Sequence, residues 1–162
     1  KDFSLFIAMG HTNMNKNRAK IFNECKKLGY ELLSYVHPTS TIGEDVKMGE
    51  NCLVLENNVI QPFVTIGDDV IIWSNNVISH DVVIKDHCFI IHQVVISGYV
   101  TIESYCIIAA NSTINNRVII AKECIIGMGA LIMKNTIEKG VYAISSAQRL
   151  PITSDRIKDI TS

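Results

Sequence analysis

Large aliphatic side chains recur at every sixth position through most of this chain, from Ile42 to Ile132. An α-helix would show a period of about 3.6 residues and a half-buried strand a period of about two. A period of six instead predicts a coil of short strands, in which each side of the coil carries one inward aliphatic residue. The positions of this series are Ile42, Met48, Val54, Ile60, Ile66, Ile72, Ile78, Ile84, Ile90, Ile96, Ile102, Ile108, Ile114, Ile120, Ile126 and Ile132.

Small or compact residues form a second series, four positions after each aliphatic residue, and they are expected to point inward beside the turns. Because three hexads make one coil, the 16 hexads predict an all-β fold, a parallel β-helix of a little over five coils. Successive coils should stack at the spacing of paired strands, about 4.8 Å. The second series is Val46, Cys52, Asn58, Val64, Val70, Asn76, Val82, Cys88, Val94, Val100, Cys106, Ser112, Val118, Cys124, Ala130 and Thr136.

The beginning of the chain lacks this period, and residues 1–38 are predicted to form a small, partial α/β unit. Residues 3–9 read as a buried strand, residues 18–28 have the apolar spacing of a helix, and residues 31–36 read as a second strand. Gly29 suits the position just after a helix end. A unit this small cannot hold a core alone, so it is expected to pack on the first coil or on another subunit.

The β-helix is predicted to span residues 39–137, and residues 138–162 are predicted to cap it. Solenoid ends need such a cap because their last coil is otherwise open to solvent. Within the capping segment, residues 141–144 read as a strand and a short helix is predicted after Ser154.

Composition and charge exclude several classes of function. The formal net charge is -1, so no basic field is available to hold nucleic acid. No apolar run approaches the length of about 20 residues that a membrane span needs. With five cysteines, no CxxC pair and no export signal, the chain is expected to be cytoplasmic and free of disulfides. Cys88, Cys106 and Cys124 follow one another at intervals of three hexads and are predicted to form a ladder of small buried residues.

His80 is the residue whose surroundings best suit chemistry. His80 comes two residues after the inward Ile78, and Asp81 follows it. The equivalent position one coil later is Gly98. A histidine beneath a glycine has open space over its imidazole, and a backbone N–H near the glycine can point into that space. Acyl transfer needs this pair, a base for the attacking group and a donor for the oxyanion. The alternative is an ordinary surface histidine at a corner of the coil.

Two stretches around this position resemble a known active site. Ser79-His80-Asp81-Val82-Val83-Ile84, followed by Ile96-Ser97-Gly98-Tyr99-Val100-Thr101-Ile102, is similar to the catalytic stretch of hexapeptide-repeat acyltransferases. The nearer resemblance is to the bacterial family of sialic-acid O-acetyltransferase-like and nucleotide-amino-sugar N-acetyltransferases. Residues 7–10, Arg18, residues 28–30 and residues 36–38 resemble the second half of the small N-terminal domain of that family.

The resemblance implies a left-handed β-helix that works as a homotrimer and transfers an acetyl group from acetyl-CoA, with no metal. The acceptor it implies is a sugar or amino sugar, nucleotide-linked, in bacterial surface-glycan synthesis. His80 matches the general base of the family, Asp81 its acidic neighbour and Gly98 the backbone amide at the acetyl carbonyl.

Two further positions carry roles by the same resemblance, since Ala110 and Met128 stand where later coils of the family offer backbone groups to coenzyme A. Asn75 is expected near His80, on the preceding side of the coil, and is a weaker candidate for contacts with the acceptor. Residues 145–148 depart from the family, which has a Gly-x-Pro-Ala-like exit loop there.

Two other functions remain open on the sequence. A γ-class carbonic anhydrase shares this coil and binds zinc with three histidines, and His87 and His92 have the H-x4-H spacing of that class. His80, His87 and His92 are nevertheless expected on three different sides of the coil, where one chain cannot direct them to one ion. A catalytically silent β-helix that serves assembly is the other alternative. Sugar-lipid acyltransferases that use acyl carrier protein carry a similar His-Asp stretch, but they add a helical C-terminal domain.

Overall fold

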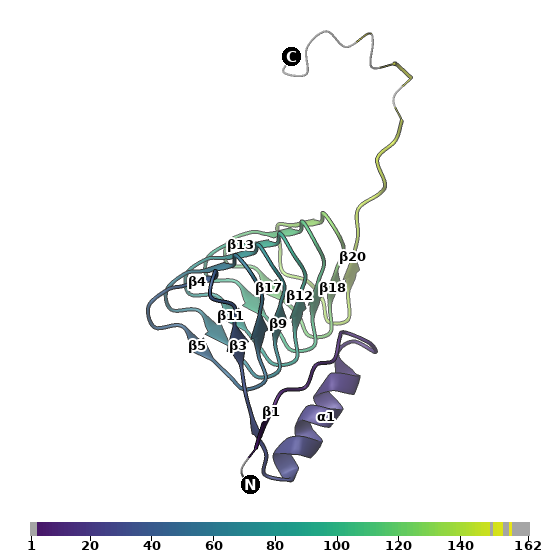
Figure 1. Cartoon of the computed structure of the whole chain (residues 1–162). Helices are drawn as coiled ribbons and strands as arrows, with labels where there is room; N and C mark the ends of the chain where they lie inside the picture. Colours follow the sequence, from purple (N-terminus) through teal and green to yellow (C-terminus); the bar gives the residue numbers. More distant parts are fainter. Residues whose placement is uncertain (1–2, 150, 154–155, 157–162) are drawn as a thin grey trace.

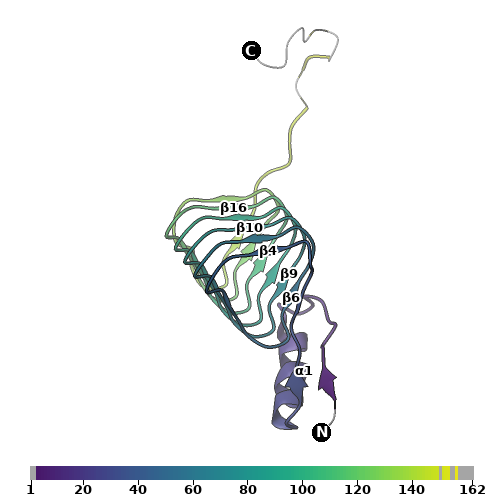
Figure 2. The ribbon, with the colours of Figure 1, turned by 60° about the vertical axis from the view of Figure 1, so that its left-hand side comes forward.

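Short strands wind into a three-sided, left-handed parallel β-helix (Figure 1). The computed structural model describes residues 3–149, 151–153 and 156. Figure 2 shows the stacked coils with their three-cornered outline. The predicted fold class is therefore confirmed.

Each side of the coil is one parallel sheet. Face 1 contains β3 (Tyr35–Val36), β6 (Leu53–Val54), β9 (Ile71–Ile72), β12 (Phe89–Ile90), β15 (Ile107–Ile108), β18 (Ile125–Ile126) and β20 (Val141–Tyr142). Face 2 contains β4 (Thr41–Ile42), β7 (Val59–Ile60), β10 (Val77–Ile78), β13 (Val95–Ile96), β16 (Thr113–Ile114) and β19 (Leu131–Ile132). Face 3 contains β5 (Lys47–Met48), β8 (Thr65–Ile66), β11 (Val83–Ile84), β14 (Thr101–Ile102) and β17 (Ile119–Ile120).

The second residue of each strand points into the coil and the first points out. Ile78, Ile84 and Ile90, on three successive sides, are all 0% exposed. Their partners on the next coil are three hexads further along, as in the pair Ile78 and Ile96. The compact residues of the second series also enter the core, which runs as one column through the stack. The six-residue period therefore predicted both the core and its register, except in the first coil, where Ile42 is 38% exposed.

Corners join the faces and are named here by the faces they join. Within one coil, the 1–2 corner comprises residues 73–76, the 2–3 corner residues 79–82 and the 3–1 corner residues 85–88. Most corners place one residue in the left-handed region, such as Asp81 at φ 58°. Most residues pay for that conformation with steric strain. Stacking offsets the cost because the same residue donates its N–H to the preceding coil, as Tyr99 does to the His80 carbonyl at 3.2 Å.

The N-terminal unit contains β1 (Ser4–Leu5), α1 (Lys16–Lys27) and β2 (Glu31–Leu32), and β1 pairs with β2 in parallel. The predicted helix is confirmed, and Gly29 follows its end at φ 76°. The buried strand predicted over residues 3–9 is wrong for most of its length, because only Ser4–Leu5 is a strand and Phe3 is 78% exposed. The strand predicted over residues 31–36 divides into β2 and β3, and β3 already belongs to the coil.

Helix α1 packs against the 3–1 corner and is oblique to the axis of the stack (Figure 1). Near one end Lys26 pairs with Glu50 at 2.6 Å, and near the other Lys16 pairs with Glu123 at 2.9 Å. Four coils cover about 19 Å, and the oblique helix spans this distance together with the two long lysine side chains. The unit therefore packs across several coils of its own chain, rather than on the first coil alone.

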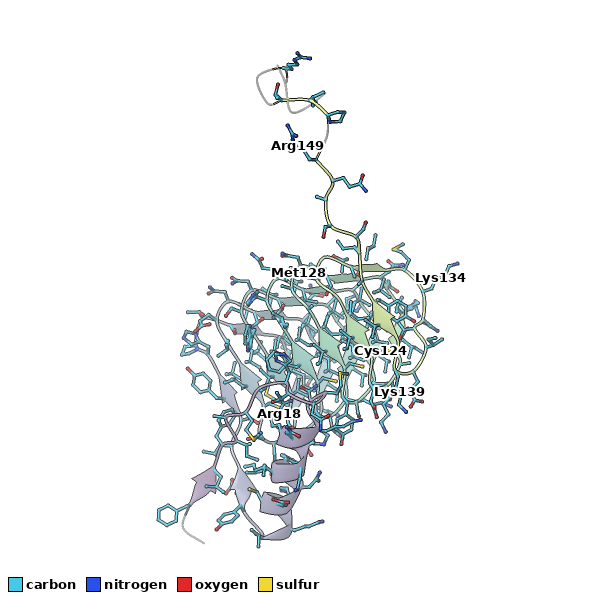
Figure 3. The ribbon with its side chains drawn as sticks, turned by 90° about the vertical axis from the view of Figure 1, so that its right-hand side faces the viewer. Arg18, Cys124, Met128, Lys134, Lys139 and Arg149 are labelled. Carbon is cyan, nitrogen blue, oxygen red and sulfur yellow. The ribbon has the colours of Figure 1, made fainter. Side chains whose placement is uncertain are left out.

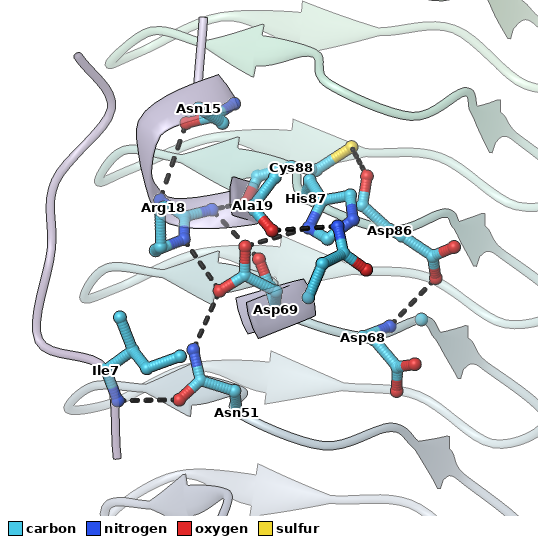
Figure 4. Close-up of polar contacts among 12 residues, drawn as sticks. Ile7, Asn15, Arg18, Ala19, Asn51, Asp68, Asp69, Asp86, His87 and Cys88 are labelled. Atoms are coloured by element: carbon cyan, nitrogen blue, oxygen red, sulfur yellow. Dashed lines mark hydrogen bonds and ion pairs between the residues drawn. The ribbon is translucent and has the colours of Figure 1, made fainter. Parts of the chain in front are cut away.

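A buried ion pair fixes this unit to the coils (Figure 4). Arg18 and Asp69 both have fully buried side chains, and Arg18 Nε donates to Asp69 Oδ1 at 2.9 Å. The same carboxylate accepts from Asn51 Nδ2 at 2.7 Å and from His87 Nδ1 at 2.8 Å. Arg18 Nη2 also donates to the backbone carbonyls of Asp69 and Cys88 at 2.9 and 3.3 Å. These bonds satisfy groups that would otherwise be buried without partners.

The chain leaves the coils after β20, which completes face 1 by pairing with β18. Residues 143–149 are exposed and lead away from the stack (Figures 1 and 2). The short helix predicted after Ser154 falls almost wholly outside the described residues. Helix α1, the one α-helix among the described residues, is too short and too polar to cross a membrane.

We predict opposite outcomes for the same substitution at two neighbouring isoleucines. Ile120→Ala removes buried atoms from a side chain that is 0% exposed, and it should lower the free energy of unfolding by about 2–5 kcal/mol. Ile119→Ala changes a side chain that is 44% exposed and should cost about 1 kcal/mol or less. Urea unfolding followed by circular dichroism measures both. Equal losses would mean that the inward and outward positions are wrongly assigned.

Arg18→Met should destabilise the protein far more than a surface change on the same helix. The substitution leaves the Asp69 carboxylate buried without its cation, which costs about 3–5 kcal/mol. Lys20→Met is the control, because Lys20 is exposed and its ion pair with Glu24 is long, at 3.9 Å. This substitution should change stability by about 0.5 kcal/mol or less. Urea unfolding, with amide exchange of residues 16–27, tests this. Similar values for the two variants would contradict the anchoring role of Arg18.

Candidate functional site

His80 lies at the 2–3 corner, two residues after the end of β10, and its side chain is 47% exposed. Its Nδ1 lies 2.8 Å from Asp81 Oδ2. A carboxylate only accepts hydrogen bonds, so the proton of the imidazole belongs on Nδ1. Nε2 is then left with a free lone pair, which is the state that a general base requires. The pairing of His80 with Asp81 thus supplies both the tautomer and the orientation of the ring.

Gly98 lies on the next coil, directly over this imidazole. A Cβ at Gly98 would stand only 2.8 Å from His80 Cε1 and 2.9 Å from Nε2. Any larger residue would therefore displace the ring. The Gly98 carbonyl accepts the Arg117 N–H at 3.0 Å, whereas the Gly98 N–H finds no acceptor among the described residues. The neighbouring turn has an equally unused N–H at Asn116, so the imidazole beneath Gly98 is what distinguishes this turn.

Two further side chains extend the site along the same corner. The Tyr99 ring meets the His80 ring edge to face, with 5.1 Å between their centroids. The guanidinium carbon of Arg117 lies 4.6 Å from the centre of the Tyr99 ring, at the distance of a cation–π contact. Sequence reasoning missed both residues, although each is one coil after the preceding member of the series Asp81, Tyr99 and Arg117.

The other predicted site residues lie at a different corner. Asn75, Ala110 and Met128 belong to turns of the 1–2 corner, and the width of face 2 separates them from His80. Ala110 is buried and Met128 is 67% exposed, and the N–H of each finds no acceptor among the described residues. Position 127 requires a glycine for a structural reason, because a Cβ there would lie 2.8 Å from the Tyr142 carbonyl oxygen. A single chain therefore brings His80, Asp81 and Gly98 together. It does not bring Asn75, Ala110 or Met128 to them.

The remaining histidines of the zinc alternative are dispersed. His87 lies at the 3–1 corner, bonded to Asp69, and His92 lies at the 1–2 corner, stacked on Trp73 with 5.1 Å between ring centroids. Among the residues that the structure describes, no three His, Cys, Asp or Glu side chains are close enough to share a metal ion. One chain thus has no arrangement that matches the three-histidine site of a γ-class carbonic anhydrase.

The buried cysteines have structural roles. Cys52, Cys88 and Cys106 are 0% exposed, and each thiol donates to a carbonyl of the following coil, at 3.0, 3.2 and 3.1 Å. Burial raises the pKa of Cys52 to about 11 and raises the pKa of Cys88 well above its ordinary value. Both thiols therefore stay protonated near neutral pH, which makes them poor nucleophiles. The predicted ladder of small buried residues is present.

A cavity of about 210 Å³ lies between the N-terminal unit and face 1. Met9 and Gly10 form one side, and Ile71, Trp73 and Phe89 form the other. Sequence reasoning missed it, although a signal was available. The outward positions of face 1 carry an apolar residue once in every coil, which marks a stripe that another element must cover. That stripe is Leu53, Ile71, Phe89, Ile107 and Ile125.

Comparison with sequence families supports the repeat. Residues 45–80 and 81–116 match the family described as "Bacterial transferase hexapeptide (six repeats)". No curated protein sequence matches the chain.

Solved structures share the fold. A perosamine N-acetyltransferase from Caulobacter crescentus, solved with CoA and GDP-perosamine, has a TM-score of 0.82 at 23% identity, over 86% of this chain and 66% of that one. The acetyltransferase domain of PglB from Neisseria gonorrhoeae has a TM-score of 0.81 at 21% identity, over 86% of this chain and 66% of that one. WeeI from Acinetobacter baumannii has a TM-score of 0.71 at 23% identity, over 80% of this chain and 62% of that one.

The chain thus spans slightly less than two thirds of the proteins it resembles. It carries the hexapeptide repeat of bacterial transferases and has the same fold as a perosamine N-acetyltransferase and the acetyltransferase domain of PglB.

Proposed function

We propose that this protein transfers an acetyl group from acetyl-CoA to an amino sugar, with His80 as general base. The observation that carries the proposal is the stack of His80, held by Asp81, beneath Gly98 with its unused N–H. Structures with the same fold contain CoA together with GDP-perosamine, or acetyl coenzyme A. Those proteins support a donor of this class and an acceptor that is a nucleotide-linked amino sugar, of the kind used in bacterial surface-glycan synthesis.

In the proposed reaction, His80 Nε2 takes a proton from the acceptor amine as its nitrogen attacks the thioester carbonyl carbon. The Gly98 N–H donates to the oxygen, which becomes an oxyanion in the tetrahedral intermediate. Collapse of this intermediate breaks the carbon–sulfur bond, and the imidazolium returns its proton to the leaving thiolate. Asp81 stabilises the imidazolium through the Nδ1–H bond while the proton resides on His80. The products are an N-acetylated sugar and free CoA.

A homotrimer accounts for the division of site residues between two corners. Face 1 is covered by the N-terminal unit, whereas the outward valines of face 2, Val59, Val77 and Val95, are 37–40% exposed. In a three-fold assembly, one kind of surface meets a different kind on the next subunit. We propose that the 2–3 corner of one subunit faces the 1–2 corner of its neighbour. His80 and Gly98 would then share one cleft with Asn75, Ala110 and Met128 of the partner subunit.

The proposed compartment is the cytoplasm. The five cysteines are all free thiols, as is usual in a reducing environment.

His80→Ala should lower the rate of acetyl transfer by about 10²–10⁴-fold, the ordinary effect of losing a general base. His80 is at an exposed corner, so the melting temperature should stay unchanged. Release of the CoA thiol, measured with a chromogenic disulfide and a nucleotide-linked amino sugar as acceptor, gives the rate. Asp81→Asn should lower the rate less, because the asparagine still orients the ring but no longer stabilises its charged form.

His37→Ala is a suitable control, since His37 is a part-exposed histidine near Glu56 at the beginning of the coils. It should retain the wild-type rate, and His92→Ala should be far milder than His80→Ala. If His92→Ala were as damaging as His80→Ala and the purified protein held stoichiometric zinc, the acetyltransferase proposal would be wrong.

The mass of the protein in solution should be that of three chains. Light scattering after size exclusion measures it at micromolar concentration. Val77→Asp on face 2 should shift the mass toward one chain, because it places a charge in the proposed contact, whereas Lys85→Asp at the 3–1 corner should not. A stable wild-type monomer that transfers acetyl groups at full rate would contradict the proposed shared cleft.

A further inference from the structure

We propose that Arg117 determines acceptor specificity by binding an anionic group that the acceptor carries close to its reacting amine. That group is a carboxylate of the sugar itself or a phosphate attached to the sugar, since both present a pair of oxygens to a guanidinium. The inference rests on the proposed function, because it names a further chemical feature of the acceptor in that reaction. It assigns a role to a cation that the chemistry at His80 does not use.

A single aromatic ring connects Arg117 to His80. The guanidinium carbon lies 4.6 Å from the centre of the Tyr99 ring, and 5.1 Å separates the centres of the Tyr99 and His80 rings. The planes of these two rings are nearly perpendicular, at 86°. The guanidinium and the imidazole are therefore no further apart than the two ends of one sugar residue with its substituents. A sugar whose amine reaches His80 can present a second group to Arg117.

Arg117 is held in place before a ligand binds. Its backbone N–H donates to the Gly98 carbonyl at 3.0 Å, which fixes this turn against the coil before it. Its guanidinium makes a cation–π contact with Tyr99, one coil earlier. A guanidinium already positioned by an aromatic ring loses less freedom when it binds a ligand. The planar fork of its N–H groups matches the two oxygens of a carboxylate or a phosphate.

The protein does not neutralise this guanidinium. Lys26 and Lys85 each contact a glutamate, at 2.6 and 2.8 Å. Arg117, by contrast, is exposed and has no acidic partner within the described part of the chain. The nearest acidic residue in its column, Asp81, lies two coils earlier and contacts His80 Nδ1 instead, at 2.8 Å. An uncompensated cation beside the reacting groups favours an anion there.

The anion at Arg117 belongs to the acceptor, because the charged end of the donor lies elsewhere. Acetyl-CoA separates its thioester from its phosphates by the whole pantetheine arm. With the thioester between His80 and Gly98 and the arm extended, those phosphates lie far beyond a guanidinium that is only one ring from the imidazole. Lys134 follows one coil later and projects outward from the last coil (Figure 3). Arg117 is therefore the cation of this corner that borders the reacting amine.

Titration of the full chain with three amino sugars, followed through the imidazole NMR signals of His80, tests this role. Glucosamine carries no anion, glucosamine 1-phosphate adds a phosphate, and 2-amino-2-deoxyglucuronate adds a carboxylate. At least one anionic sugar should bind about tenfold more tightly than glucosamine, as expected for charge-assisted hydrogen bonds. The sugar that shows this gain identifies the source of the anion. Arg117→Gln should remove the gain, and Arg117→Lys should retain part of it, because the charge remains without the planar fork.

The rate of acetyl transfer to the anionic sugar gives a second measure. Arg117→Gln should raise the KM for that sugar about tenfold and leave kcat within about twofold. The reason is that the contact is the same in the ground state and in the transition state, so it contributes only uniform binding. The KM for acetyl-CoA should not change.

Lys122→Gln is the matched control, because Lys122 is also an exposed cation over a tyrosine, 5.8 Å from the centre of the Tyr105 ring. It lies at the 3–1 corner, so the affinities for all three sugars should stay at the wild-type values. Equal binding of the three sugars by the wild-type protein, or an equal loss in Lys122→Gln, would overturn the inference while leaving the proposed function intact. A loss confined to kcat, or to the KM of acetyl-CoA, would also overturn it. Wild-type protein that bound no acetyl-CoA would instead overturn the proposed function.

Discussion

Every coil of this protein must complete the hydrogen bonds of the coil before it. The N–H of Ser79 reaches the carbonyl of Ile96, and the N–H of Ser97 reaches that of Ile114, at 2.9 and 3.1 Å. A coil of any other length than three hexads would leave a row of backbone groups unpaired, which is costly in a buried position. The same constraint aligns side chains into columns. A residue therefore has its vertical neighbours three hexads away along the chain, whether it lies in the core or at a corner.

This alignment explains which features could be predicted from the sequence. The inward Ile and Val residues follow the period, so the core and its register were predictable residue by residue. His80 and Gly98 are separated by three hexads, so their contact followed from the same rule. The N-terminal unit obeys no such rule. Arg18 meets Asp69, and Asn15 donates to the Cys106 carbonyl at 3.3 Å, through tertiary packing across several coils. No local pattern gives those separations, and the cavity between that unit and face 1 was missed for the same reason.

The predicted site residues divide between two corners because a three-sided coil points its turns in three directions. A ligand as long as acetyl-CoA extends past a single corner, and one chain offers it only one wall. The 2–3 corner contains His80 beneath Gly98, whereas the 1–2 corner contains unused N–H groups at Ala110 and Met128. Under the proposed function, catalysis would therefore depend on assembly. The neighbouring subunit of the proposed homotrimer would complete the cleft, even though each subunit already has a complete core.

The corner turns also separate chemistry from stability. Pro62, His80, Gly98, Asn116 and Lys134 occupy equivalent positions on five successive coils, and the face 2 strand before each of them ends in an inward isoleucine. Their side chains project away from the core, so the fold tolerates proline, imidazole, hydrogen, amide or ammonium at this position. The chemical character of a corner is consequently set by the order of residues in its column. A glycine next to a histidine leaves room for a reacting group, and cations one and two coils later add charge along the same line without any change in the core.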